Sequence, residues 1–497
     1  MRNTKNLLVF VFAAAAGSAF GQTSGVTDPI CSQTSDAAQK MATVCTPTPS
    51  CPETSDNARK MGTDHSVPRR IIDCTATPHP DAGGQNGLSP FFAPSAIAER
   101  IFTEQASRLK TDDRIAMYGT MIQSKPENLH YQLLLAGSYI QKMRETTDFG
   151  YLDRAAQIIG NVISADSQNY EALRLRSEVE LERHHFKQVA EYSRQLMNTS
   201  PNDPWNWGTL GDALVEMGDY DGAAEAYQKM VVLRPDLASY NRAAWFRFLS
   251  GDMPGAIDIM QKAISAGSPS SENTAWCLVE LGHLYLKNGQ PNEAEQAYAA
   301  AVRVFPGYHP GYAGMGRAQS AKGDFKTAIA SYEKAQASTP LPDYAAALYD
   351  LYIVQKDVKN AKKQLEMIDV IDQINKNSGE VTNRNVALIF ADHNYHVDRA
   401  LELATAELDV RKDIYSYDAL AWALYKNEKF AEADQAMAKA LRMGTPEPAF
   451  YYHAEQIAVA NGKTKEAEEY RKHYANRFVS VTVSSHDGPE PERRAAK

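Results

Sequence analysis

The sequence predicts an all-α protein built as a solenoid of stacked antiparallel helix pairs. One phrase returns along the chain: GDYDGAAEAY starts at Gly218, and close variants of it start at Gly251, Gly289 and Gly323. Between these phrases, stretches rich in Ala, Leu and Tyr carry apolar residues at the three-to-four spacing of amphipathic helices. A phrase that recurs about every 34 residues is typical of repeat arrays, in which each unit packs only on its neighbours.

The stretch from Asp203 to Pro235 illustrates one unit. Asp203 and the following Pro can start a first helix. Gly218 ends this helix, because Gly adopts a left-handed backbone at little cost. A second helix follows, and Pro235 stops it. The faces expected to meet between the two helices carry Trp207, Leu210, Gly211 and Leu214 in the first helix and Ala223, Tyr227 and Met230 in the second.

The equivalents of Gly218 set the boundaries of the other units. Two gaps between them are longer, and polar loops at residues 266–273 and 375–381 account for the extra length. One irregular unit fits upstream if MRETTDFG, residues 143–150, is a loop insertion, and residues 95–110 are expected to cap the N-terminal end of the array. The nine regular turns fall at His184, Gly218, Gly251, Gly289, Gly323, Lys356, Tyr395, Glu428 and Gly462.

The Trp, Leu-Gly, Ala, aromatic and Pro positions of the unit resemble the tetratricopeptide repeat, and this resemblance covers residues 125–480. It implies a right-handed superhelix. ASYNRAAWFRFLSGDMPGAI and FPGYHPGYAGMGRA are also similar to segments of exported bacterial multi-repeat proteins. Lys356, Tyr395 and Glu428 stand where the repeat has Gly, so these three turns are expected to use other backbone conformations.

The chain is expected to have four parts. Residues 1–21 are typical of a signal peptide, because Arg2 and Lys5 precede an apolar run of residues 7–16 and small residues precede a cut before Gln22. Such a run is too short to cross a bilayer, which needs about 20 residues. Residues 22–94 form a polar arm expected to be disordered, residues 95–480 the array of nine to ten units, and residues 481–497 a disordered tail.

This organisation predicts a soluble protein that is exported to the periplasm or secreted, with no transmembrane segment in the mature chain. An uncleaved N-terminal anchor is the alternative for residues 1–21.

The cysteines are concentrated in the arm. In an oxidising compartment four cysteines indicate two disulfides, and three pairings are possible. The candidates are Cys31, Cys45, Cys51 and Cys74. Cys277 lies on an expected helix and is predicted to be buried. The alternative for the arm is a soft-metal site, for which Met41, Met61, His65 and His79 would add ligands.

The concave side of such a superhelix is lined by the first helix of each pair, and it is the expected partner-binding groove. The resemblance assigns fixed positions of the first helix to this groove. Aromatic residues there are typical anchors of recognition, although each Trp can instead pack against the next unit. The predicted partner-binding residues are Trp205, Asp212, Asn241, Trp245, Phe248, Trp276, His283, Arg317, Trp422 and Tyr452.

Charge narrows the expected partner. The formal net charge is −9 and the chain has no long basic block, which argues against nucleic acid and anionic membranes. Acidic residues outnumber basic ones at the groove positions, so the partner is expected to be a neutral or basic protein or peptide with aromatic residues.

The sequence gives no sign of an enzyme. It has no nucleophile elbow and no phosphate-binding Gly loop, and no cofactor or metal is expected. His393 and His396, in HNYH, are expected to be solvated turn histidines. The predicted function is therefore a non-enzymatic exported scaffold. The alternative is a periplasmic metal-binding protein whose repeats serve as a docking module.

Overall fold

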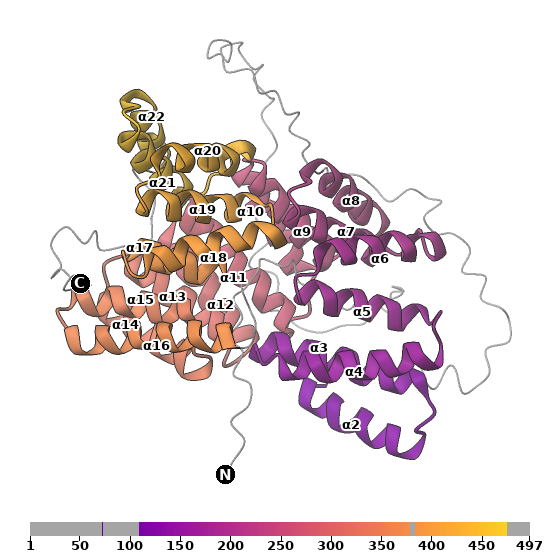
Figure 1. Ribbon diagram of the computed structural model, residues 1–497. Helices are drawn as coiled ribbons and strands as arrows, with labels where there is room; N and C mark the ends of the chain where they lie inside the picture. Colours follow the sequence, from indigo (N-terminus) through magenta and orange to yellow (C-terminus); the bar gives the residue numbers. More distant parts are fainter. Residues whose placement is uncertain (1–71, 73–108, 378–382, 475–497) are drawn as a thin grey trace, which may run out of the picture. The chain divides into compact units, whose positions relative to one another are not determined.

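The computed structural model describes residue 72 and residues 109–377 and 383–474, and helices joined by turns are the regular secondary structure of this part of the chain (Figure 1). The signal segment, the four arm cysteines, residues 95–108 of the expected cap and the C-terminal tail lie outside the described residues. Their predicted roles, including the arm disulfides, therefore stay predictions. Cys277 is fully buried with a free thiol, as predicted.

The helices follow one another with short turns between them. In chain order they are α2 (Thr111–Ser124), α3 (Leu129–Thr146), α4 (Gly150–Ala165), α5 (Tyr170–Glu182), α6 (Phe186–Thr199), α7 (Pro204–Glu216), α8 (Tyr220–Leu233), α9 (Leu237–Leu249), α10 (Met253–Ser265), α11 (Glu272–Lys287), α12 (Pro291–Val304), α13 (His309–Ala321), α14 (Phe325–Ser338), α15 (Pro342–Val354), α16 (Val358–Asn377), α17 (Arg384–Asp392), α18 (Val397–Val410), α19 (Ile414–Lys426), α20 (Phe430–Ala440), the 3₁₀ turn η2 (Leu441–Met443), α21 (Pro448–Ala460) and α22 (Thr464–Tyr474).

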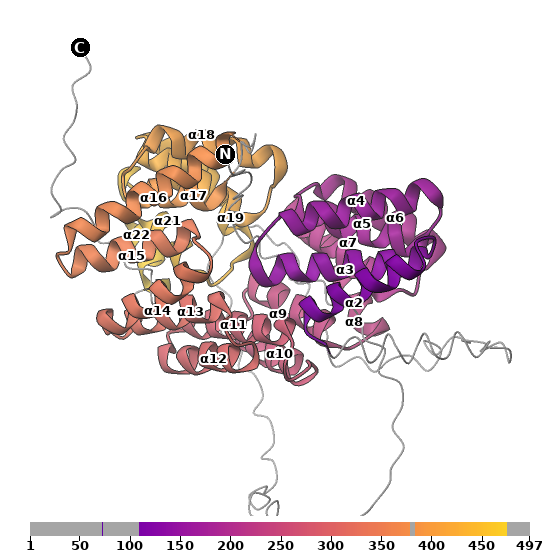
Figure 2. The same cartoon turned by 90° about the horizontal axis from the view of Figure 1, so that it is seen from below.

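These helices pack as pairs, with an odd-numbered first helix against the even-numbered second helix that follows it, as α9 packs on α10 and α13 on α14 (Figures 1 and 2). First helices also contact one another across neighbouring units, as α5 contacts α7 and α19 contacts α21. The architecture confirms the predicted all-α solenoid of stacked helix pairs.

The turn inside each pair explains the recurring Gly-Asp phrase. Gly218 has a φ of +76°, in the left-handed region that Gly adopts without strain. Asp219 then caps α8, because its Oδ1 accepts a hydrogen bond of 3.0 Å from the Gly222 amide. Asp252 caps α10 in the same way, from the Gly255 amide at 2.9 Å.

One expectation about the turns is wrong. Lys356 and Glu428 have φ values of 60°, so they take the same left-handed conformation as the glycines they replace. His184 does so as well, at 62°. The position of Tyr395 differs, because Asn394 and His396 on either side of it carry the positive φ. The repeat geometry imposes this backbone on non-Gly residues, at a cost of roughly 1–2 kcal/mol each.

Small residues allow the two helices of a pair to approach closely. A Cβ on Gly211 would overlap the ring of Tyr227, and one on Gly316 would lie 2.6 Å from Cδ2 of Tyr332. The predicted contact between a small residue and a large ring is therefore present. Filling such a contact with an extra methyl group typically costs 1–3 kcal/mol.

Two predicted loops are shorter than expected. The first four residues of MRETTDFG continue α3, which ends at Thr146. The start of the segment 375–381 belongs to α16, which runs to Asn377. Longer first or second helices therefore absorb residues that the repeat period assigned to insertions. The loop expected at residues 266–273 is present over residues 266–271, because α10 ends at Ser265 and α11 begins at Glu272.

Candidate partner-binding surface

The ten predicted partner-binding residues all lie on first helices, but most of their side chains are enclosed by the array. Six are buried: Trp205, Asp212, Asn241, Phe248, Trp276 and Trp422. The other four are partly exposed: Trp245, His283, Arg317 and Tyr452. Partner contact by any of the ten stays a prediction, and the partly exposed side chains are the ones available to a partner.

Asp212 shows how a buried groove residue is used inside the array. Arg242 on α9 is 1% exposed and holds Asp212 through Nε at 2.9 and 3.1 Å and Nη2 at 2.7 Å. The Tyr227 hydroxyl donates to the same carboxylate at 2.8 Å. Burial raises the pKa of Asp212, while Arg242 acts in the opposite direction. Asp212 therefore joins α7, α8 and α9.

A different arrangement occurs on α17, α19 and α21. The buried Trp422 stacks on Tyr425 with ring centroids 4.8 Å apart, and its Nε1 donates to Asp392 Oδ1 at 2.7 Å. Lys426 Nζ lies over the Trp422 ring at 4.6 Å, and the ring of Tyr452 lies 5.9 Å from it. We define the tyrosine patch as the partly exposed residues of this group: Asp392, Tyr425, Lys426 and Tyr452.

Two buried residues, His453 and Asp418, support the tyrosine patch. His453 stacks on Trp422 at 4.2 Å, and its Nδ1 lies 2.9 Å from Asp418 Oδ1. Burial opposes a charge on His453, but Asp418 outweighs it and raises the pKa of His453. Because Trp422 is fixed by stacking and by a hydrogen bond, the two tyrosines are presented on a rigid base, as recognition surfaces require.

His393, beside this group, does not match its prediction. It is not a solvated turn residue, because its ring is 9% exposed and Nε2 lies 3.0 Å from Asp350 Oδ1. Burial opposes a charge on the ring, but the hydrogen bond and charge of Asp350 outweigh it and raise the pKa of His393 to about 9. His396 is half exposed, as predicted. Among the described residues no cluster of His, Cys, Asp and Glu could hold a metal.

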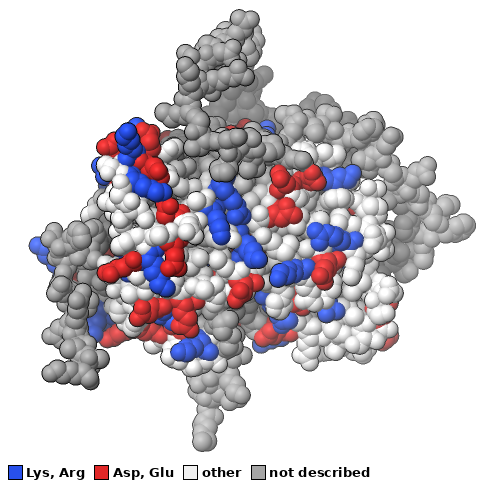
Figure 3. Space-filling model, turned by 45° about the horizontal axis from the view of Figure 1, so that its top comes forward, with Lys and Arg blue, Asp and Glu red and all other residues white. Residues whose placement is uncertain are grey.

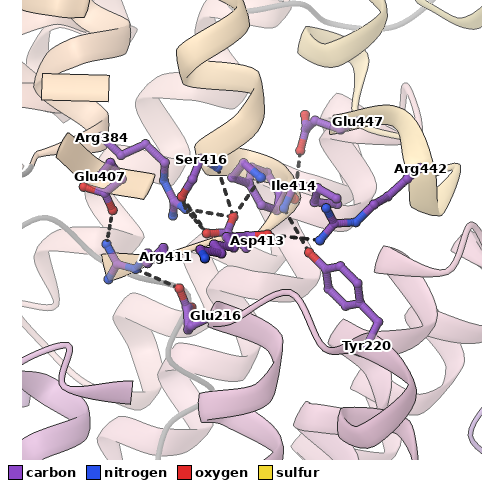
Figure 4. Close-up of polar contacts among 12 residues, drawn as sticks. Glu216, Tyr220, Arg384, Glu407, Arg411, Asp413, Ile414, Ser416, Arg442 and Glu447 are labelled. Atoms are coloured by element: carbon purple, nitrogen blue, oxygen red, sulfur yellow. Dashed lines mark hydrogen bonds and ion pairs between the residues drawn. The ribbon is translucent and has the colours of Figure 1, made fainter. Parts of the chain in front are cut away.

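The most unexpected feature is a contact between helix ends that lie far apart in the sequence (Figure 4). The amide of Lys412 donates to the carbonyl of Glu216, the last residue of α7, at 2.8 Å. The amide of Ile414, the first residue of α19, donates to the hydroxyl of Tyr220 at 2.9 Å. The ends of α-helices leave backbone groups without intrahelical partners, and here the carbonyl at the end of α7 and the amide at the start of α19 each find a partner across the junction. We call this the closing contact.

Charged side chains surround the closing contact. Arg411 Nε lies 2.7 Å from Glu216 Oε2, and its Nη1 lies 2.6 Å from Glu407 Oε1. Burial raises the pKa of Glu216 to about 7, although Arg411 acts in the opposite direction. Arg442 donates to the carbonyl of Lys412 at 3.0 Å (Figure 4).

Further contacts extend the same junction to α9 and α11. The Thr445 hydroxyl donates to the carbonyl of Leu249, the last residue of α9, at 2.6 Å. Lys287 Nζ lies 2.6 Å from Glu447 Oε2. The ring of Trp245 stacks on Tyr415 with centroids 5.9 Å apart. Trp245, one of the predicted partner-binding residues, therefore packs on the chain's own C-terminal units while staying partly exposed.

The surface charges are mixed. On the face drawn in Figure 3, Lys and Arg are interspersed with Asp and Glu over the described residues, without an extended area of one sign. In residues 109–377 and 383–474, none of the helices combines the length and the apolar character needed to cross a membrane.

Stacked helix pairs with a left-handed residue between the two helices define a helical-repeat protein. The match to known families names the repeat. Family models described as tetratricopeptide repeat match residues 209–272 and 279–340 and residues 414–444. The chain therefore contains tetratricopeptide repeats at these residues, and helix pairs of the same period continue between and beyond them.

Individual relatives are distant. Tetratricopeptide repeat protein 36 of Mus musculus is 30% identical over 95 residues, which cover 19% of this chain and 51% of that protein. The chain thus spans about half the length of this curated relative. Among solved structures, MamA protein is 23% identical, with 33% of this chain and 87% of that chain covered at a TM-score of 0.27. PilW, a widely conserved type IV pilus biogenesis factor, is 14% identical, with 41% of this chain and 93% of that chain covered at a TM-score of 0.37.

Proposed function

We propose that this protein is a non-enzymatic scaffold that holds a protein or peptide partner on the tyrosine patch of α17, α19 and α21. The observation that carries the proposal is the pair of partly exposed tyrosines, Tyr425 and Tyr452, fixed on a buried Trp. Tyrosines presented on a rigid base are enriched at recognition surfaces, because they bury a large apolar area and offer a hydroxyl.

The chemistry of the partner follows from the patch. Asp392 and Lys426 are of opposite charge, and the acids on neighbouring first helices are already engaged, as Asp418 is by His453. Charge complementarity therefore favours a neutral segment with aromatic or aliphatic side chains over a basic one, although the sequence alone predicts either. A peptide of this kind would stack on the tyrosines and donate to the carboxylate of Asp392.

Export is part of the proposal. The positively charged and apolar residues 1–21 support it, and they predict a mature protein that begins at Gln22 in the periplasm or outside the cell. The mass of the protein isolated from a native envelope or culture fraction tests this part. A chain that retains residues 1–21 would contradict cleavage.

The partner-binding proposal is tested with Tyr425→Ala/Tyr452→Ala in the full chain. Partners are captured by crosslinking in the native extract, identified by mass spectrometry, and then measured with purified protein. We expect the double variant to weaken binding at least tenfold, as loss of aromatic anchors does. Tyr285→Ala is the matched control, because Tyr285 is also partly exposed but accepts a hydrogen bond from Gln261 on α10. Equal binding by all three proteins would refute the tyrosine patch.

A further inference from the structure

One residue of the predicted arm is described, and it is buried in the array. Ile72 is 1% exposed and belongs to the same apolar cluster as the inner residues of α7 to α10. Its carbonyl lies against Arg247 in the last turn of α9, 175 residues further along the chain. An apolar side chain and the backbone beside it are thus held at a single place on the repeats.

The guanidinium of Arg247 is arranged to hold a main-chain carbonyl. Nε and Nη2 both donate to the oxygen of Ile72, at 3.0 and 2.5 Å. Nη1 donates to Asp252 Oδ2 at 2.7 Å, and Asp252 is itself fixed as the cap of α10. The repeat turn therefore orients the guanidinium, and two charged donors point at one backbone oxygen. Such charge-assisted pairs are stronger than neutral hydrogen bonds.

We propose that Arg247 and the apolar cluster around Ile72 form a peptide-binding seat that holds the chain's own arm at Ile72. The ligand class is a main-chain segment with an aliphatic residue, recognised by burial of its side chain and by its carbonyl. With this seat the arm is attached to the repeats at a fixed point and is not a free linker. This inference is independent of the proposed partner on α17–α21.

The position of Arg70 provides a direct test. Trypsin cleaves after Arg70, two residues before Ile72, and a protease needs several residues on both sides of the bond to be free. In the full chain we expect cleavage after Arg70 to be slower than cleavage after Lys60. Arg247→Leu and Ile72→Asp should each speed cleavage after Arg70 by about tenfold, since opening of a local contact governs such cleavage.

The controls separate loss of the seat from damage to the array. Arg183→Leu removes an arginine that is 36% exposed and pairs with Asp153 on a different unit, so cleavage after Arg70 should be unchanged. Ile72→Asp leaves every residue of the repeats intact, so it retains its value as a test if Arg247→Leu weakens α9. Equal cleavage after Arg70 in wild type and Ile72→Asp would overturn the proposal.

The seat must also be filled by the same chain. Protection of the bond after Arg70 should be the same at low and high protein concentration, because an intramolecular ligand does not dissociate on dilution. Protection that falls on dilution, together with a dimer in gel filtration, would assign the occupant to a second copy and would overturn the proposal as stated.

Discussion

Tyr220→Phe is the cleanest perturbation of the closing contact. The hydroxyl of Tyr220 accepts the amide of Ile414 at 2.9 Å, and the two residues are 194 positions apart. The substitution removes this acceptor and keeps the ring, over which Arg442 Cζ lies at 5.1 Å. Ile414 is fully buried and is the first residue of α19, so its amide has no intrahelical partner to replace the hydroxyl.

The expected magnitude follows from this geometry. Leaving a buried amide without an acceptor costs about 1–3 kcal/mol. Because the contact joins two distant units, this cost falls on local opening of the junction between α8 and α19. It corresponds to roughly a 5- to 150-fold faster exchange of the Ile414 amide, if exchange proceeds through that opening.

Hydrogen exchange resolved at Ile414 and Lys412 measures the effect. Both amides should exchange faster in Tyr220→Phe, because the amide of Lys412 bonds to the carbonyl of Glu216 in the same contact. Tyr285→Phe is the control: the Tyr285 hydroxyl accepts a hydrogen bond from the side chain of Gln261 in an exposed contact, so the effect should stay within about 0.5 kcal/mol. An Ile414 amide that exchanges at the wild-type rate in Tyr220→Phe would refute the reasoning.

Two further predictions concern the turns and a buried ion pair. Lys356→Gly should raise the free energy of unfolding of its unit by about 1 kcal/mol, because Lys356 is held at a φ of 60°. Lys362→Gly is the control: it lies in the exposed interior of α16 and should lower the free energy of unfolding by about as much. Thermal melts compare the two variants. His393 should make stability depend on pH. Its pKa is raised from 6.5 to about 9, so its contribution of about 3 kcal/mol is complete below pH 6.5 and is lost as the pH rises through 9. Melting temperatures of wild type and Asp350→Asn between pH 6 and 10 test this, and an unchanged pH dependence in Asp350→Asn would contradict the assignment.

The repeat architecture could be predicted from the sequence because the residues that determine it lie close together along the chain. Gly218 and its equivalents mark left-handed turns, and Asp219 caps the helix that follows. Gly211 leaves room for the ring of Tyr227 in the same unit. Each of these signals lies within about 20 residues of its partner, so a pattern at one period carries it. The left-handed backbone at Lys356 escaped prediction, because there the geometry of the array overrides residue preference.

The candidate site could be predicted from the sequence only in part. Position within the repeat correctly placed Trp422 and Tyr452 on first helices, yet it gave no measure of how far each side chain is covered. Coverage depends on Arg242 reaching Asp212 and on Tyr415 stacking on Trp245, which are contacts between different units. The buried Trp residues fit the alternative that each Trp packs against another unit. The repeat pattern does not show which residues of that other unit the Trp contacts.

The closing contact also bears on how a partner would act. In an open repeat array each unit is stabilised mainly by its two neighbours, and the terminal units open first. Here α19 contributes Ile414 to the closing contact at its first residue and Tyr425 to the tyrosine patch near its last turn. A partner held on the patch would therefore stabilise the same helix whose N-terminal amide is satisfied by α8. Binding and the closing contact share α19, so each should strengthen the other by the same factor, as thermodynamic linkage requires.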